Sequence, residues 1–228
     1  MRAILLPVKE LNNAKKRLLH ALSPEERFGL ARAMFADTVR VLRGVRLAER
    51  IFVVTSYEPA MEAAEENGWE ILREERQVCE SDSVDYASRV CERRGVRALL
   101  RLPLDLPLVQ SADVDELLEV GCIAPALVIV PSRDGTGTNA MLRTPPALFP
   151  SHFGQGSFAK HLTEAQNAGA QIFIRRNERL EMDVDDEADL RALLVQDLSA
   201  THTGRWLQES GVAAKFRRNK ETRIAAGA

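Results

Sequence analysis

The chain has 228 residues, of which 45% are hydrophobic and 28% are charged, and its net charge is −2. This length and composition suit one sizeable α/β domain of a globular protein, and the near-neutral charge gives no overall argument for nucleic-acid binding. No apolar run approaches the roughly 20 residues that a membrane-spanning helix needs. Cys79, Cys91 and Cys122 lack metal-binding spacing. We therefore expect a cytoplasmic protein with reduced thiols and with neither nucleic-acid nor membrane partners.

The chain begins with an apolar run over residues 2–6, which predicts a buried strand ended by Pro7. Four cations follow within nine residues, namely Lys9, Lys15, Lys16 and Arg17. A cationic loop at the carboxyl end of a strand suits a polyphosphate, because Arg offers a planar fork and Lys a compact charge. A solvated charge run is the alternative, but the position directly after a strand favours phosphate binding. Neither the P-loop nor the dinucleotide-binding glycine pattern is present.

Predicted helices and strands alternate through the middle of the chain. A capping box at Ser23 starts a helix that runs to Arg43. Further helices are expected over 57–67, over 83–94 and, capped by Ser111, over 111–120; strands are expected over 51–55, 69–72, 98–102 and 127–130. This order predicts a single α/β domain whose mostly parallel sheet is flanked by helices on both faces.

The stretch from Arg101 to Val109 reads RLPLDLPLV and follows a predicted central strand. Asp105 is a lone carboxylate among leucines and prolines, and an unpaired buried charge is strongly disfavoured. Pro103 and Pro107 keep the turn stiff. Open α/β sheets bind ligands at the carboxyl ends of their strands, so a functional carboxylate is one interpretation and a turn or helix-cap residue is the other.

After Pro131 the chain changes to loops rich in glycine and small hydroxyl side chains. Residues 132–139 read SRDGTGTN, and their amides and hydroxyls, Thr138 among them, are able to bind an anion. Gly154 and Ser157 precede a predicted helix over 158–168, whose N-terminus is able to hold a phosphate or carboxylate. A plain turn or helix cap is the alternative for each loop. Short strands are expected over 140–142 and 171–174.

The last part of the chain divides into an acidic segment and a tail. Residues 180–190 predict an extended, strand-like stretch leading into a helix, with Asp183 and Asp185 on one face, either binding a cation or lying in solvent. From Ser199 onward we expect weak packing, with one short docked helix around Trp206 and Leu207 and then a mobile basic end. The expected division is a domain over 1–198 and a tail over 199–228.

These features share one chemical logic. Carboxylates bind a hard cation such as Mg²⁺, and lysines and arginines neutralise phosphate oxygens, which together serve nucleotidyl transfer from a nucleoside triphosphate. The four histidines are scattered without ligand spacing, and no Ser-His-Asp or Cys-His arrangement is indicated.

Five motifs in order carry a resemblance to a known family: PVK with AKKRL, DLPL at Asp105, GTGTN, FGQGS, and DVD followed by DL at residues 189–190. From residue 1 to about residue 195 the chain resembles the CofC/FbiD guanylyltransferases of deazaflavin coenzyme (F-420) biosynthesis. The resemblance implies a GT-A-like nucleotidyltransferase architecture related to molybdopterin guanylyltransferase (MobA-like).

The resemblance also implies a reaction. GTP and Mg²⁺ bind, and the phosphate of a three-carbon phospho-acid attacks the α-phosphate while pyrophosphate leaves. The acid is 2-phospho-L-lactate, phosphoenolpyruvate or 3-phospho-D-glycerate, and a downstream transferase consumes the product. A homodimer is compatible with the family.

By the same resemblance, residue roles carry over to this chain. Asp105 is expected to hold the metal together with Asp183 or Asp185. The phosphates are expected to meet Lys9, Lys15, Lys16 and Arg17, and the phospho-acid to meet Thr138, Gly154 and Ser157.

One segment departs from the family pattern. Many members have Gly-Leu-Asn-x-Ala before the Asp turn, whereas residues 80–87 read ESDSVDYA here. In related enzymes this segment lies near the nucleotide base or sugar, and Ser81 and Ser83 are expected to cap a helix and contact GTP. The alternatives are a MobA-like enzyme with a molybdopterin or sugar-acid acceptor, and a non-catalytic GTP-binding module.

Overall fold

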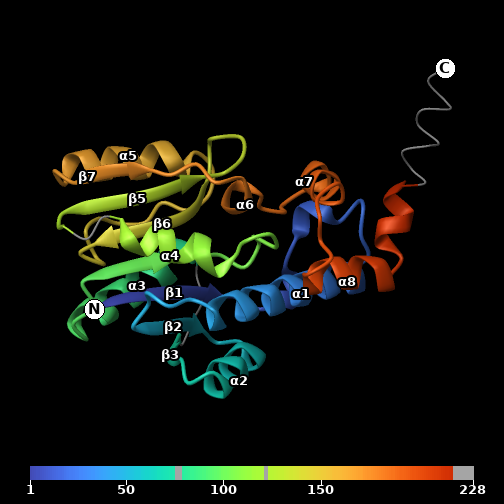
Figure 1. Cartoon of the computed structure of the whole chain (residues 1–228), viewed down its shortest axis with the longest axis horizontal. Helices are drawn as coiled ribbons and strands as arrows, with labels where there is room; N and C mark the ends of the chain where they lie inside the picture. The colour runs from blue at the N-terminus through green and yellow to red at the C-terminus, as the bar shows by residue number, and fades with distance from the viewer. Residues whose placement is uncertain (75–78, 121–122, 218–228) are drawn as a thin grey trace.

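The computed structural model describes residues 1–74, 79–120 and 123–217. Their seven-stranded sheet has the order β3-β2-β1-β4-β6-β5-β7 (Figure 1), and only the two pairings made by β6 are antiparallel. The strands are β1 (Arg2–Val8), β2 (Arg50–Thr55), β3 (Glu70–Arg73), β4 (Ala98–Arg101), β5 (Ala126–Pro131), β6 (Thr138–Thr144) and β7 (Gln171–Ile174). The predicted mostly parallel sheet is confirmed, with β6 longer than expected.

Helices cover both faces of the sheet because alternate strand residues point to opposite sides. On β1, Ile4 and Leu6 pack toward one face, and Ala3 and Leu5 toward the other. The first face carries α1 (Pro24–Arg43), α2 (Glu58–Glu66), α4 (Ser111–Glu119) and α6 (Glu178–Glu181), and the second carries α3 (Glu80–Arg93) and α5 (Ser157–Asn167). Among the described residues, no helix combines the length and apolar character that crossing a membrane requires.

The order of the strands places a crevice at the end of β1. This strand lies between β2 and β4, so the connections that follow β1 and β4 leave in opposite directions, as at the ligand sites of open α/β sheets. The predicted end of the strand at Pro7 is wrong, since β1 pairs with β2 through to Val8. Its pairing with β4 stops at Leu5, so the missing N–H of Pro7 interrupts no paired residue on that side.

Two predicted helix starts differ from the structure. The helix α3 begins at Glu80, and Cys79 caps it by accepting a hydrogen bond from Asp82 N at 3.4 Å. The cap of α4 is Gln110, whose capping box is completed by Asp113, whereas Ser111 Oγ donates to a carbonyl of α1. An acceptor in the right place serves as a cap even where the residue type is not a favoured one.

The predicted acidic strand over 180–190 is wrong. Two short helices, α6 and α7 (Glu187–Leu193), are separated there by a loop over 182–186. Asn177 caps α6, and Asp186 caps α7 in a capping box with Asp189. Asp and Asn compete with strand pairing by accepting local backbone N–H groups, which explains the outcome.

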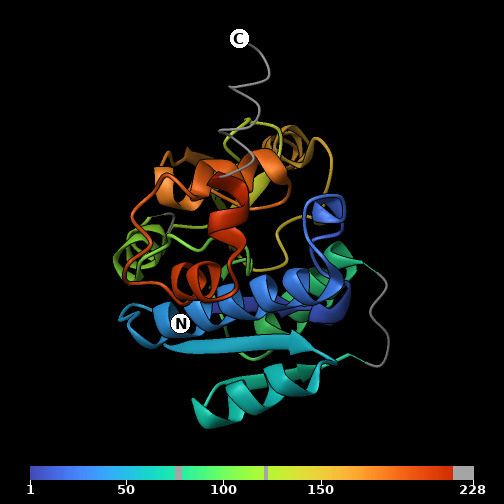
Figure 2. The same ribbon diagram turned by 90° about the vertical axis from the view of Figure 1, so that its right-hand side faces the viewer.

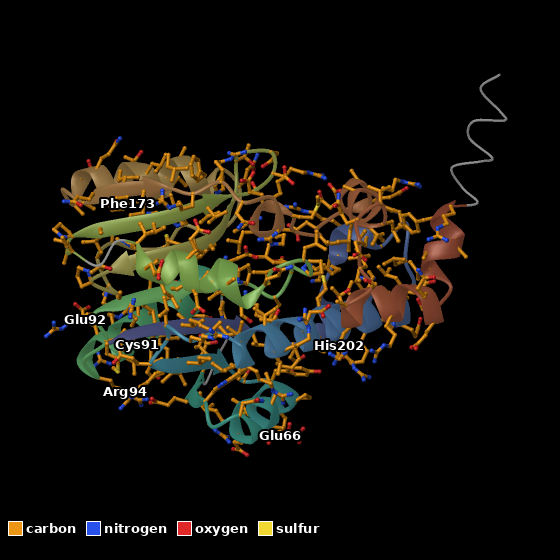
Figure 3. All side chains as sticks on the ribbon, in the orientation of Figure 1. Glu66, Cys91, Glu92, Arg94, Phe173 and His202 are labelled. Atoms are coloured by element: carbon orange, nitrogen blue, oxygen red, sulfur yellow. The ribbon has the colours of Figure 1, made fainter. Side chains whose placement is uncertain are left out.

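The C-terminal segment packs more firmly than expected. The helix α8 (His202–Glu209) lies against α1 in both ribbon views (Figure 1 and Figure 2). The buried Asp37 of α1 accepts hydrogen bonds from the backbone N–H groups of His202, which is labelled in Figure 3, and Thr203 at 2.8 and 2.9 Å. Leu207 joins an apolar cluster with residues of α1 and α7. The docked helix is confirmed, the weak packing expected from residue 199 is wrong for 199–217, and the expected mobile end over 218–228 lies outside the described residues.

Candidate active site

A cavity of about 770 Å³ opens at the carboxyl edge of the sheet. Its size is typical of sites for small ligands. Residues from the loop after β1, from the turn after β4, from the start of α3 and from the loop before α7 line it, and they include Lys9, Lys15, Lys16, Arg17, Glu80, Arg101, Asp105 and Asp185. All four cations of the first loop therefore share one cavity with Asp105.

Lys15 lies at the centre of the cationic loop. Buried Leu11 and Leu18 anchor the loop on either side of it, in the turns η1 (Leu11–Asn13) and η2 (Lys16–Leu18). Lys15 has φ +53°, a left-handed conformation that is uncommon for a residue other than glycine. Its side chain is only 9% exposed, and Nζ lies 3.1 Å from Asp105 Oδ2 and 3.2 Å from Asp185 Oδ1. These two ion pairs hold Lys15 in its unusual backbone conformation.

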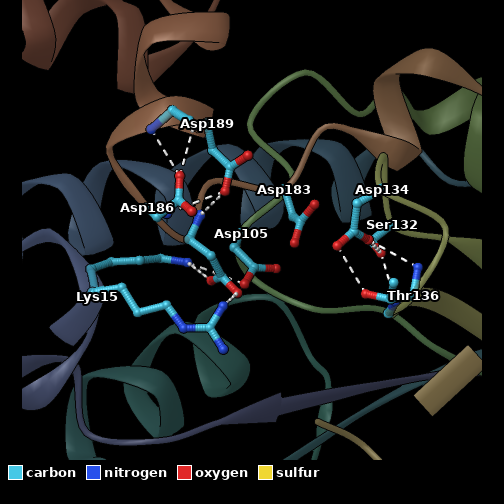
Figure 4. Close-up of polar contacts among 12 residues, drawn as sticks. Lys15, Asp105, Ser132, Asp134, Thr136, Asp183, Asp186 and Asp189 are labelled. Atoms are coloured by element: carbon cyan, nitrogen blue, oxygen red, sulfur yellow. Dashed lines mark hydrogen bonds and ion pairs between the residues drawn. The ribbon is translucent and has the colours of Figure 1, made fainter. Parts of the chain in front are cut away.

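A single backbone hydrogen bond fixes the acidic loop against the Asp105 turn. Val184 N donates to Asp105 O at 3.1 Å, and the Val184 side chain is fully buried. Asp183 and Asp185 therefore flank Asp105, although they lie on a loop rather than on a strand. Figure 4 shows the carboxylates of Asp105 and Asp183 close to each other, and Asn139 Nδ2 donates to Asp183 Oδ1 at 3.2 Å.

The loop that carries these carboxylates is itself held by Asp189. Asp189 Oδ2 accepts from the backbone N–H groups of Asp185 and Asp186 at 3.1 and 3.2 Å (Figure 4). Asp189 Oδ1 pairs with Arg133 Nη2 at 2.7 Å. Arg17 Nη1 adds a contact of 3.5 Å to Asp185 Oδ2, at an exposed position. Both sides of the acidic loop are thereby fixed around the cavity.

The pKa values of Asp105 and Asp183 show that the negative charge is compensated at the first carboxylate and not at the second. Burial alone would raise the pKa of Asp105, but the charges of Lys15 and Arg101 outweigh it and the pKa is lowered, so Asp105 is ionised. Burial alone would lower the pKa of Lys15, but Asp105 and Asp185 raise it, so Lys15 is charged. Burial and then the charge of Asp105 raise the pKa of Asp183 to about 6. This excess of negative charge favours a further cation.

The donor set suits Mg²⁺. Mg²⁺ prefers oxygen ligands and usually binds through one or two carboxylates, with phosphates and waters completing its shell. Asp105 would provide one carboxylate, and Asp183 or Asp185 would provide the second. Lys15 pairs with both Asp105 and Asp185, whereas Asp183 has no ion pair among the described residues. Across residues 1–74, 79–120 and 123–217, no three side chains of His, Cys, Asp or Glu are grouped closely enough to hold a metal by themselves.

The side chains of Thr138 and Ser157 meet each other in a buried network rather than lining the cavity. Ser157 Oγ donates to Thr138 Oγ1 at 3.2 Å, and Thr138 Oγ1 lies 3.0 Å from His161 Nδ1. His161 Nε2 accepts from His152 N at 2.8 Å, and burial followed by the charge of Arg143 lowers the His161 pKa to about 3. The neutral His161 therefore carries its proton on Nδ1, and this N–H donates a hydrogen bond to Thr138 Oγ1.

The expected GTP contacts and the loop before α5 meet at the start of α3. Ser81 Oγ accepts from Phe153 N at 2.9 Å, and Ser83 Oγ donates to Cys79 O at 3.0 Å. Neither serine lines the cavity. Gly154 is exposed, with φ +117°, a conformation that favours glycine. The roles of Thr138, Gly154, Ser157, Ser81 and Ser83 in ligand binding stay predictions.

Comparison with known proteins identifies the family. The family model described as "Guanylyl transferase CofC like" matches residues 1–226. The chain belongs to the CofC guanylyltransferase family. The match extends beyond the five motifs into the C-terminal segment, in agreement with the packing of α8 on α1 in this CofC-family protein.

Two relatives of this CofC-family chain differ in their named acceptors. The phosphoenolpyruvate guanylyltransferase of Rubrobacter xylanophilus is 39% identical over 188 residues, covering 82% of this chain and 91% of the relative. The 2-phospho-L-lactate guanylyltransferase of Methanothermobacter thermautotrophicus is 30% identical over 217 residues, covering 95% and 94%.

Solved structures agree on the fold. A protein from Desulfovibrio desulfuricans G20 described as a nucleotide-diphospho-sugar transferase superposes with a TM-score of 0.75 at 16% identity, over 94% of this chain and 97% of that one. A cytidylyltransferase from Leptospira borgpetersenii gives 0.58 at 13% identity, over 93% and 95%. The expected nucleotidyltransferase architecture is confirmed.

Sequence reasoning missed four residues of this CofC site. Glu80 and Arg101 line the cavity and pair with each other, while Asn139 and Asp189 hold the acidic loop. Arg101 did leave a signal, because it is a charged residue at the end of the otherwise apolar strand ALLR. Glu80 left none, since it stands in a segment rich in other polar residues.

Proposed function

We propose that this CofC-family protein transfers GMP from GTP to the phosphate of a three-carbon phospho-acid and releases pyrophosphate. The supporting observation is the pairing of Lys15 with Asp105 and Asp185 at a cavity whose first loop supplies further cations, with Asp183 close to Asp105. A triphosphate needs such positive charge, and the surplus carboxylates need the metal that accompanies it.

Each group at the cavity has a role in this proposal. Lys9, Lys16 and Arg17 are exposed on the first loop and would neutralise the triphosphate, and Lys15 would hold a phosphate oxygen from beneath. Asp105 and Asp183 would hold Mg²⁺, which when bound would withdraw charge from the α-phosphate and the leaving pyrophosphate. Asp185 keeps Lys15 and Arg17 in place through its two ion pairs.

The reaction needs positioning more than proton transfer. An acceptor phosphate oxygen attacks the α-phosphorus, a new P–O bond forms, and the bond from the α-phosphorus to the bridging oxygen of pyrophosphate breaks. A phosphate monoester has its second pKa near 6, so most of the nucleophile is already fully ionised at pH 7. The neutral, fully buried His161 agrees with a mechanism that uses no general base.

We propose phosphoenolpyruvate as the first acceptor to test, because the Rubrobacter relative that is 39% identical is named for it. 2-Phospho-L-lactate follows from the Methanothermobacter relative, and 3-phospho-D-glycerate completes the class. The product would be a guanylylated acid with an activated diphosphate. In F-420 biosynthesis a downstream transferase would consume it.

The test mixes the protein with Mg²⁺, GTP and each phospho-acid separately and measures released pyrophosphate. We expect release with one of the three acids and none without an acid. Absence of release with all three would refute the transferase proposal, and GTP binding measured in the same samples would then identify a non-catalytic binding module. Release only with a molybdopterin or sugar-acid acceptor would assign a different transferase.

A further inference from the structure

Another part of the cavity lining is built around Arg101. This residue ends β4, lines the cavity, and has a side chain only 8% exposed. Arg101 Nη1 donates to the carbonyls of Thr138 and Asn139 at 3.4 and 3.1 Å, and the Phe153 ring stacks on the guanidinium at 4.3 Å. A guanidinium held by two carbonyls and a ring face keeps one orientation, as a group that discriminates between ligands must.

Glu80 is the partner of Arg101 in this part of the cavity lining. Arg101 Nη2 donates to Glu80 Oε1, and the Glu80 side chain remains 32% exposed at the cavity. Arg101 Nε is buried and has no hydrogen-bond partner among the described residues. The pair thus presents a donor-bearing group beside an acceptor-bearing one, at a position that no step of the proposed phosphate chemistry uses.

The charge of the pair tells which part of a substrate it fits. The charges of Glu80 and Arg101 sum to zero. An anionic phosphate or carboxylate would therefore be attracted by the guanidinium and repelled by the neighbouring carboxylate. Lys9, Lys15 and Lys16 already provide the anion-binding part of the cavity. An uncharged part of the substrate that carries a hydrogen-bond acceptor next to hydrogen-bond donors fits the pair better.

Guanine has such an edge. Its O6 accepts hydrogen bonds, whereas its N1–H and N2–H₂ donate them; adenine reverses the first two positions, with a donor at N6 and an acceptor at N1. We propose that the Glu80–Arg101 pair recognises the Watson–Crick edge of guanine, with Arg101 donating to O6 and Glu80 accepting from N1–H and N2–H₂. This inference rests on the proposed function, since it places GTP in this cavity.

The proposal fixes an order of nucleotides. GTP makes both contacts, and inosine triphosphate keeps the O6 and N1–H contacts but lacks the amino group. In ATP, the adenine amino group would face the donor Arg101, and the acceptor N1 would face the acceptor Glu80. A site that hydrogen-bonds one pattern of donors and acceptors strongly rejects the opposite pattern. We expect kcat/KM to fall in the order GTP, inosine triphosphate, ATP.

The deciding variant is Glu80→Gln, measured by pyrophosphate release with the accepted phospho-acid. The loss of a charge-assisted acceptor is expected to raise the KM for GTP about tenfold or more. Because the carboxamide both donates and accepts hydrogen bonds, the preference for GTP over ATP, measured as the ratio of their kcat/KM values, is expected to fall. The KM for the phospho-acid is expected to stay unchanged. Glu70→Gln is the matched control, because Glu70 is also 32% exposed and pairs with Arg50 and Arg94 away from the cavity; it is expected to alter neither constant.

Calorimetric binding of GTP and ATP to the wild-type protein and to Glu80→Gln, with thermal unfolding as the folding check, separates the two proposals. Discrimination that is lost in Glu80→Gln supports base recognition even if no acid is guanylylated. An unchanged GTP-to-ATP ratio in the folded variant would overturn it while leaving the transferase proposal intact. A raised KM for the phospho-acid alone would also overturn it, by assigning the pair to the acceptor.

Discussion

The buried Asp113 and the half-buried group of Asp105, Asp183 and Asp185 differ in how far the chain compensates their charge. Asp113, at the start of α4, is 3% exposed and accepts hydrogen bonds from Gln110 N at 2.9 Å, Asn177 Nδ2 at 2.9 Å and Arg179 Nε at 2.8 Å. Burial would raise its pKa, but these donors, Arg179 first, lower it. Asp183 accepts a side-chain hydrogen bond from Asn139, but burial and the charge of Asp105 outweigh it and its pKa is raised to about 6.

The difference is the one expected between a structural carboxylate and the functional carboxylates of the proposed mechanism. At Asp113 the chain supplies every partner, and the result ties the loop before α6 to the start of α4. In the other group, the Lys15 ammonium pairs with Asp105 and Asp185 and the exposed Arg17 also contacts Asp185, whereas no cation pairs with Asp183 among the described residues. Burying uncompensated charge is costly, and such a cluster persists where a ligand or metal completes it.

Asp105→Asn tests the functional cluster at its centre and should have the largest effect. Even outer partners of a metal typically contribute ten- to a hundredfold, so we expect pyrophosphate release to fall more than about a hundredfold. The substitution removes one negative charge from three neighbouring carboxylates. The melting temperature should therefore stay close to that of the wild-type protein. Wild-type turnover in the variant would make Asp105 a turn residue only.

Asp183→Asn should reduce turnover about ten- to a hundredfold, because it removes one of the two carboxylates proposed for the metal. The amide keeps the hydrogen bond with the side chain of Asn139 after rotation, so the loop should stay in place. Calorimetric titration with Mn²⁺ is expected to show weaker metal binding than in the wild-type protein. Equal metal affinity in the two proteins would assign the metal to Asp105 and Asp185 instead.

Asp113→Asn tests the structural cluster and should leave the kinetic constants unchanged. Three donors face this carboxylate, and weakening charge-assisted bonds at a buried site should destabilise the fold by about 1–3 kcal/mol. In a chain of this size, each kcal/mol lowers the melting temperature by about 2–4 °C. Thermal unfolding measures the loss, and a change in the KM for GTP without any loss of stability would contradict the division drawn between the clusters.

The smallest expected effect is a pH dependence of stability that belongs to Asp183. Its folded pKa of about 6 lies above the ordinary aspartate pKa of 3.8, so the folded state binds the proton more tightly. The resulting stabilisation is complete below 3.8 and is lost as pH rises through 6. Without metal, the melting temperature of the wild-type protein should therefore decline more between pH 4.5 and 7 than that of Asp183→Asn, and Mg²⁺ should stabilise the wild-type protein more at pH 7.5 than at 5.5.

Local sequence patterns predicted much of the fold because they act over short distances. The capping box at Ser23, the apolar strand periods and the stiff turn at Asp105 each depend on residues a few positions apart. The cationic loop after the first strand and the DVD segment were recognised in the same way, and the parallel order of the strands then placed both near one edge.

Tertiary contacts decided what short-range patterns left open. Asp183 and Asp185 flank Asp105 because Val184 is buried and donates to the Asp105 carbonyl, a bond between segments about 80 residues apart. The C-terminal segment looked weak because its few apolar residues find their partners on α1, far away in sequence.

The cavity itself shows the same division most clearly. Residue types and position pointed to the cationic loop with Lys15 and to Asp105, with a solvated charge run and a turn residue as the alternatives, and the family resemblance then implied their roles. Only the fold brought Glu80 to Arg101, because an ion pair between α3 and β4 depends on how a helix lies across a sheet. Sequence thus indicated the chemistry of the cationic loop and of the Asp105 turn, and tertiary structure decided which further residues line the cavity.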